Sequence, residues 1–110
     1  MGKNAEHNSL VIPNTDDTVE VFFDQSGIDT GINPYVWYFD LEKPAKAISI
    51  NVDKISQITH INGVELKSPK NIAANGVFTD NIHEYQFMKW YSIKIKVLNA
   101  STNVEVFGRT

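Results

Sequence analysis

Cysteine is absent from the 110-residue chain, which excludes disulfides, thiolate metal sites and cysteine nucleophiles. Long apolar runs are absent as well, and none approaches the roughly 20 residues that a membrane helix needs. The first eight residues, Met1 to Asn8, are polar and lack the apolar core of a signal peptide. An excess of basic charge is absent as well, because 13 carboxylates outnumber 10 basic residues and the net charge is −3. This argues against non-specific nucleic-acid binding. We therefore expect no membrane and no nucleic-acid partner.

Titratable residues with catalytic or metal-binding spacing are also scarce. The three histidines, His7, His60 and His83, have no partner at the spacing typical of metal ligands. No serine lies in a Gly-x-Ser-x-Gly elbow. Asp40 and Glu42 share one strand face, but two solvent-facing carboxylates explain them better than a glycosidase pair does. We predict no enzyme, no metal site and no cofactor.

Alternation of apolar and polar residues with a period of two is the main positive signal. It is what a half-buried strand requires, because successive side chains point to opposite faces of a sheet. The segments that carry it are 18–24, 35–41, 47–52, 92–97 and 104–107. Their β-branched and aromatic residues also favour strands.

Turn residues separate these segments. Asn62-Gly63, between two apolar segments, predicts a tight hairpin, because both central residues of a type I′ turn need positive φ. The polar segment 99–103 predicts a second hairpin loop, joining the last two strands. The pattern predicts an all-β fold of about eight strands, either a two-sheet sandwich or jelly roll or a small barrel. An antiparallel two-sheet β-sandwich that resembles a jelly roll is favoured, because inward residues recur on every strand. We expect residues 1–8 to form a short flexible N-terminal arm and residues 9–110 a single domain.

Aromatic residues exceed what one small core needs, since there are twelve. Three adjacent pairs, Phe22-Phe23, Trp37-Tyr38 and Trp90-Tyr91, must each send one member away from the core if they lie in strands. Exposed aromatics mark an interface or a ligand platform. The candidate platform residues are Tyr35, Trp37, Tyr38, Trp90 and Tyr91.

Charge is divided unevenly along the chain. Residues 1–42 hold one lysine and eight carboxylates, whereas residues 43–110 hold nine cations and five carboxylates. Two interpretations stay open: strand pairing mixes the two groups in space, or the molecule has an acidic and a basic face that meet in an assembly.

Three segments of the C-terminal half have a pattern of turns and strands that is found in a known group of proteins. They are 61–66 with its Asn-Gly turn, 88–97 as a long strand, and 103–108 ending in Phe107-Gly108. This half of the chain resembles small β-sandwich structural proteins of tailed-bacteriophage particles. The resemblance implies a virion structural role and carries over no functional residue.

The sequence thus leads to a virion structural protein of a tailed phage, with capsid decoration or cement protein as the first hypothesis. Its partners would be other copies of itself and a major capsid or tail protein, in a homo-oligomer or lattice. It would be assembled in the bacterial host cytoplasm and reside in the virion. Two alternatives stay open: a carbohydrate-binding β-sandwich module with exposed aromatics as its platform, and a tail, connector or fibre module.

Overall fold

The computed structural model describes residues 3–24, 35–79 and 89–110, and all regular structure in these residues is β-strand. The strands are β1 (Ala5–Ile12), β2 (Thr18–Phe22), β3 (Val36–Tyr38), β4 (Ala47–Val52), β5 (Ser56–Ile61), β6 (Val64–Ile72), β7 (Gly76–Thr79), β8 (Ser92–Val97) and β9 (Thr102–Arg109). The predicted all-β class is confirmed. None of the described segments forms a helix that could cross a membrane.

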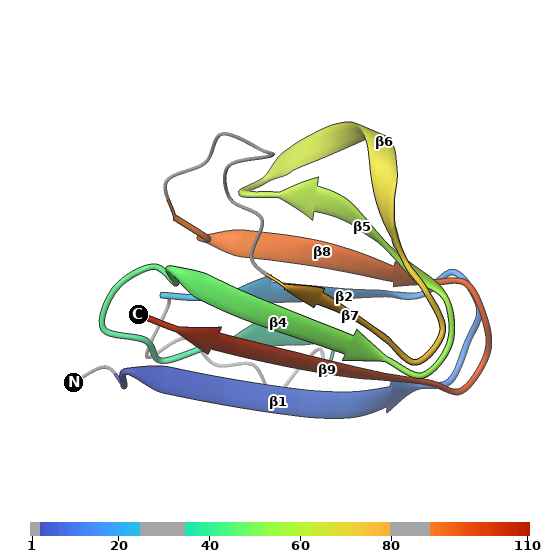
Figure 1. The fold of residues 1–110 in the computed structure, drawn as a ribbon, viewed down its shortest axis with the longest axis horizontal. Coiled ribbons are helices and arrows are strands. Elements are labelled where there is room, and N and C mark those ends of the chain that lie inside the picture. Colours follow the sequence, from blue (N-terminus) through green and yellow to red (C-terminus); the bar gives the residue numbers. More distant parts are fainter. Residues whose placement is uncertain (1–2, 25–34, 80–88) are drawn as a thin grey trace.

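Two sheets face each other across one core (Figure 1). The four-stranded sheet has the order β1-β9-β4-β7, and the five-stranded sheet has the order β3-β2-β8-β5-β6. Without β3, the remaining eight strands form two four-stranded sheets in which nearly every connection crosses from one sheet to the other, which is the jelly-roll arrangement. The predicted two-sheet sandwich is therefore confirmed.

β3 is an addition to this plan and pairs with β2 in parallel, with Val21 opposite Trp37. All other strand pairs are antiparallel. Parallel neighbours need a long connection that returns the chain to its starting end, and in the sequence residues 23–35 separate β2 from β3. The predicted antiparallel arrangement thus has one exception, at the edge of the five-stranded sheet.

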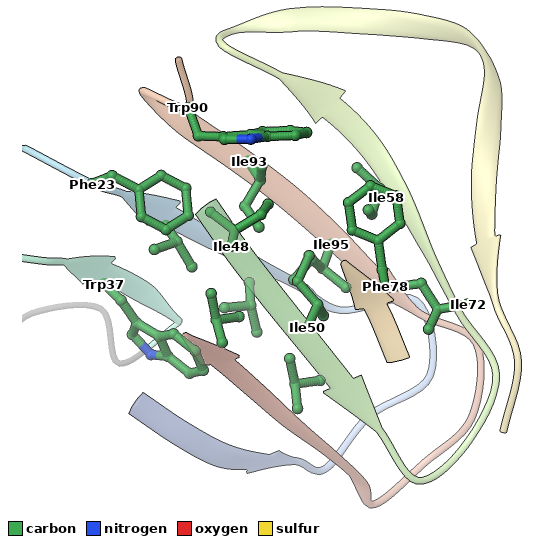
Figure 2. Packing of buried hydrophobic residues seen from close by; sticks show 14 of the residues in the cluster. Phe23, Trp37, Ile48, Ile50, Ile58, Ile72, Phe78, Trp90, Ile93 and Ile95 are labelled. Atoms are coloured by element: carbon green, nitrogen blue, oxygen red, sulfur yellow. The ribbon is translucent and has the colours of Figure 1, made fainter. Parts of the chain in front are cut away.

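The core lies between the sheets and follows the predicted alternation. Val19 and Val21 of β2, Ile48 and Ile50 of β4, and Ile95 of β8 are all buried. Figure 2 shows side chains from both sheets meeting in this space. β-branched residues suit these positions because they pack well on a pleated surface.

The Asn62-Gly63 turn forms as predicted, with φ of 52° and 80°, and Ile61 pairs with Val64 across it. Before the turn, β5 has one more residue than β8 between Ile58 and His60, which is a β-bulge. The extra residue brings both Ile58 and Ile61 onto the core face, although they are three positions apart. Strict alternation would have placed one of them outside.

Residues 99–103 do not form the predicted hairpin. β8 belongs to the five-stranded sheet and β9 to the four-stranded sheet, so this loop crosses between the sheets. Ser101 has a positive φ of 56°, and Thr102 Oγ1 donates to the carbonyl of Asn99 at 2.8 Å. A tight polar turn between two alternating segments looks the same in sequence whether the strands pair or pack face to face.

The predicted flexible arm of residues 1–8 is wrong for residues 3–8, whereas residues 1 and 2 lie outside the described chain. Strand β1 begins at Ala5 and pairs with β9 through its whole length. Lys3 forms a bridge to Leu41, in which its N–H donates to the carbonyl of Asp40. The segment lacks apolar periodicity because it is an edge strand that covers little of the core, and backbone pairing holds it in place.

Candidate functional site

Two of the five predicted platform residues belong to the core. Trp37 is 5% exposed and Trp90 is fully buried, and Figure 2 shows both rings within the buried cluster. The Trp90 ring packs edge-on against Phe78, with ring centroids 6.2 Å apart. Because neither indole reaches the surface, neither is available to stack on a ligand or anchor a partner, and this part of the prediction is wrong.

The other three platform residues reach the surface to different extents. Tyr38 stacks on Phe22 at 5.2 Å on the outside of the β2–β3 pair, and both rings are half-buried. Tyr91, 49% exposed, precedes β8. Tyr35 packs partly against the core. Each adjacent aromatic pair therefore has one core member and one outer member, as alternation requires, but the three tyrosines do not form the predicted platform together with the tryptophans.

A different aromatic lies on the outside of the four-stranded sheet. Phe107 of β9 is 41% exposed and stacks on His7 of β1, with ring centroids 6.0 Å apart. Val11 and Val77 on the two edge strands are 55% and 57% exposed. We call this surface, made by the outward residues of β1, β9, β4 and β7, the outer four-stranded face. Alternation placed Phe107 outside, since Val104 and Val106 point inward, but only the sheet order reveals its neighbours.

A polar depression of about 250 Å³ opens at one end of the outer four-stranded face. Its lining includes the side chains of Asn51, Asp53, Asn75, Asn103 and Glu105. Asn51 Nδ2 donates to Glu105 Oε1 at 3.2 Å, and Asp53 Oδ1 accepts from the Asn103 N–H at 2.8 Å. Beyond these bonds, each carboxylate has a second oxygen that can accept a hydrogen bond from a hydroxyl or amino group.

The outer edge of β1 is the longest regular strand edge without a partner in the described chain. β1 has β9 on one side only, and Figure 1 shows it as the outermost strand of its sheet. The N–H of Ser9 bonds to the side chain of the neighbouring Asn8 at 2.9 Å. A backbone group that must use a local side chain has no strand beside it.

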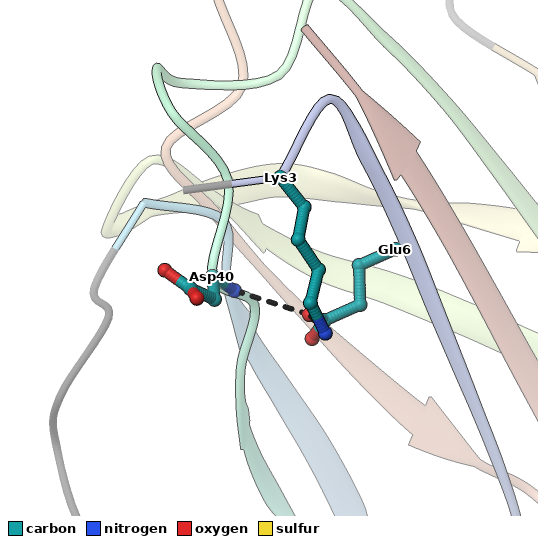
Figure 3. Close-up of polar contacts among 3 residues, drawn as sticks. All are labelled: Lys3, Glu6 and Asp40. Atoms are coloured by element: carbon teal, nitrogen blue, oxygen red, sulfur yellow. Dashed lines mark hydrogen bonds and ion pairs between the residues drawn. The ribbon is translucent and has the colours of Figure 1, made fainter. Parts of the chain in front are cut away.

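The first residues of the chain close one end of this edge. Lys3 Nζ contacts Glu6 Oε1 at 3.1 Å, and the same oxygen accepts from the Asp40 N–H at 3.4 Å (Figure 3). The Glu42 N–H donates to the Lys3 carbonyl at 2.9 Å. Asp40 Oδ1 is buried and has no hydrogen-bond partner among the described residues. In the described segments no three histidine, aspartate or glutamate side chains gather as metal ligands would.

Charges of the two halves of the chain meet where β2 lies beside β8. Glu20 is opposite Lys94, and Lys96 Nζ lies 3.7 Å from Asp16 Oδ1. Strand pairing thus mixes acidic and basic residues on the outside of the five-stranded sheet. This supports the first of the two interpretations of the uneven charge, and the charge distribution gives no argument for an assembly.

Comparison with known proteins returns no neighbour. No protein-family model matches the chain, and no curated protein and no solved structure matches it.

Proposed function

We propose that this protein is a structural component of a virus particle that acts through protein–protein contacts as one of many copies. The resemblance of segments 61–66, 88–97 and 103–108 to small phage particle proteins supports the role of capsid decoration protein. The observation that carries the proposal is the outer four-stranded face, where the half-exposed Phe107 ring stacks on His7 and where Val11 and Val77 are exposed on the edge strands β1 and β7. Aromatic residues are enriched in the cores of protein–protein interfaces.

On this face the direct cross-strand neighbours of Phe107 are His7 of β1 and Ser49 of β4. Ser49 faces Phe107 from β4, and Ser9 faces Glu105 from β1. Ser49 is small, so a partner can reach the exposed Phe107 ring from the β4 side, and aromatic anchors dominate the binding energy of protein–protein contacts. Exposed ion pairs contribute little affinity. The proposed function is passive: the sandwich supplies a rigid surface, and the partner covers Phe107.

The test is binding of the purified protein to undecorated phage capsids by co-sedimentation, with native mass measured in parallel. Phe107→Ser removes the ring from an outward position, and we expect it to weaken capsid binding about tenfold or more. Tyr91→Ser is the matched control, because it also removes a half-exposed aromatic but lies away from this face. Equal losses for both variants, or no capsid or tail protein bound by the wild type, contradict the proposal.

A second candidate function, carbohydrate binding, is favoured by the polar depression beside Phe107. Glu105 lies two residues before Phe107 on β9, so both side chains are on the same face. Amide and carboxylate groups that bond sugar hydroxyls, next to an exposed ring, form the usual chemistry of a sugar site. In this second candidate, the site takes the place of the tyrosine and tryptophan platform expected from the sequence.

Glycan-array screening and calorimetry separate the two functions. A sugar site predicts that Glu105→Gln and Asn51→Ala lower glycan affinity while native mass and capsid binding stay unchanged. Thr79→Ala, an exposed change on the same sheet outside the depression, is the control. A wild-type protein that binds no glycan on the array removes this candidate.

A further inference from the structure

We propose that β1 is a self-association strand: two copies pair their β1 strands antiparallel about a two-fold axis at Ser9, which joins two four-stranded sheets into one continuous sheet. This inference rests on the proposed function in multiple copies, and it names the contact between copies. The partner is a second copy of this chain.

The backbone of β1 presents its free hydrogen-bonding groups on the odd-numbered residues. The Asn4 carbonyl accepts from Thr110 on the β9 side, whereas the N–H and carbonyl of Lys3 bond to residues 40 and 42 on the opposite side. Successive residues of a strand point these groups to opposite edges. The groups of His7, Ser9 and Val11 therefore point away from β9, which agrees with the local bond of the Ser9 N–H to Asn8.

The other three sheet edges carry the features that block strand addition. β3 and β7 are short, with three and four residues. β6 is long but contains Pro69, between Lys67 and Lys70, which interrupts a ladder. β1 has eight residues and contains no proline and no lysine. Among the described edges it alone is regular, long and unprotected, and such an edge is a template for another strand.

Self-pairing fits the side chains of β1 and the position of its free backbone groups. With Ser9 opposite Ser9 of the second copy, His7 faces Val11 in both directions and no like charges meet on the outer face. This register confines the pairing to residues 6–12 of both copies. It stays clear of Lys3, whose backbone groups are already bonded to Asp40 and Glu42. On pairing, the Ser9 N–H exchanges its hydrogen bond to the exposed Asn8 side chain for one to a carbonyl of the second copy.

Cross-linking tests the register directly, because the chain has no cysteine of its own. Residues opposite each other in such a pair lie close enough for a disulfide. We expect Ser9→Cys to form disulfide-linked dimers under mild oxidation, well above the yield of Val11→Cys on the same strand. Val77→Cys, 57% exposed on β7 at the far edge of the same sheet, gives the background of random collisions. Equal yields for all three variants overturn the inference.

Analytical ultracentrifugation tests the contact in solution. We expect a concentration-dependent dimer for the wild type and a dissociation constant raised about thirtyfold or more by Ser9→Pro. The Ser9 N–H points away from β9, so proline leaves the fold intact, as circular dichroism checks. Ser9→Lys is the second variant, since it sets like charges opposite each other without changing the backbone.

The outcomes also separate this inference from the proposed function. Suppose the wild type forms no β1 dimer and Ser9→Pro binds capsids as well as the wild type does. This result overturns the β1 contact but leaves the proposed structural role intact. If the wild type forms no dimer and Ser9→Pro loses capsid binding, β1 pairs with a strand of the capsid protein instead, which overturns self-pairing. A strict monomer that binds no capsid or tail protein overturns both.

Discussion

The side chain of Asn62 holds the backbone of Tyr91: its Oδ1 accepts the Tyr91 N–H at 2.7 Å. The same oxygen accepts from Ser92 at 3.2 Å, and Nδ2 donates to the Lys89 carbonyl at 3.0 Å. One turn residue thus satisfies three backbone groups at the start of β8. The Asn-Gly turn is therefore both a hairpin turn and the clamp that positions the first residues of the next strand in the sheet.

Replacing Asn62 with glycine keeps the positive φ but removes the clamp. We expect Asn62→Gly to lower the free energy of unfolding by about 1–2 kcal/mol, because three backbone groups lose their partner. The measurement is urea denaturation. Asn75→Gly is the matched control, since Asn75 also has a positive φ, 57°, and no side-chain bond of Asn75 is found in the described chain. Equal stability of Asn62→Gly and wild type would contradict the clamp.

Gly108 lies against the ring of Phe23. A Cβ at this position would lie 3.0 Å from two atoms of that ring. We expect Gly108→Ala to destabilise the protein by about 1–3 kcal/mol, because an added methyl group in a packed core forces its neighbours to move. Thermal or urea unfolding measures this. The double variant with Phe23→Leu should lose less unfolding free energy than the sum of the losses in the two single variants. Strict additivity would show that the two residues do not interact.

The Trp90-Tyr91 pair tests the assignment of inner and outer aromatics. Truncation of buried Trp90 to alanine should cost about 3–5 kcal/mol. Truncation of Tyr91, which is 49% exposed, should change stability by less than about 1 kcal/mol. Chemical denaturation of the two single variants provides the comparison. A loss for Tyr91→Ala as large as that for Trp90→Ala would place both rings in the core.

Truncation of the N-terminus tests the reassignment of residues 5–8. Removal of residues 1–8 deletes half of β1, including His7 and its stack with Phe107. We expect Tm to fall by about 5 °C or more relative to a variant that lacks only residues 1–4, since roughly 1 kcal/mol shifts Tm by several degrees in a domain of this size. Differential scanning calorimetry gives both values. Identical Tm values would show that residues 5–8 do not stabilise the fold, as expected of a flexible arm.

The inward positions of most strands were predictable because burial on one face leaves a period of two in the sequence. Val19, Val21 and Phe23 illustrate this. The site was less predictable for the same reason. Alternation states that Trp90 and Tyr91 point to opposite sides, but it does not state which side is the core, and it gives no neighbours across the sheet. The stack of His7 on Phe107 joins residues 100 positions apart.

The sequence by itself determined the β class, the Asn62-Gly63 turn and the alternation of inner and outer residues, because these depend on side-chain periodicity and on the φ that a residue tolerates. Tertiary structure decided the pairing of β1 with β9, the crossing of residues 99–103 between sheets and the parallel addition of β3. These depend on backbone hydrogen bonds between distant segments, which carry little side-chain signature. The open edge of β1 is a property of sheet order alone, and no local pattern in residues 5–12 encodes it.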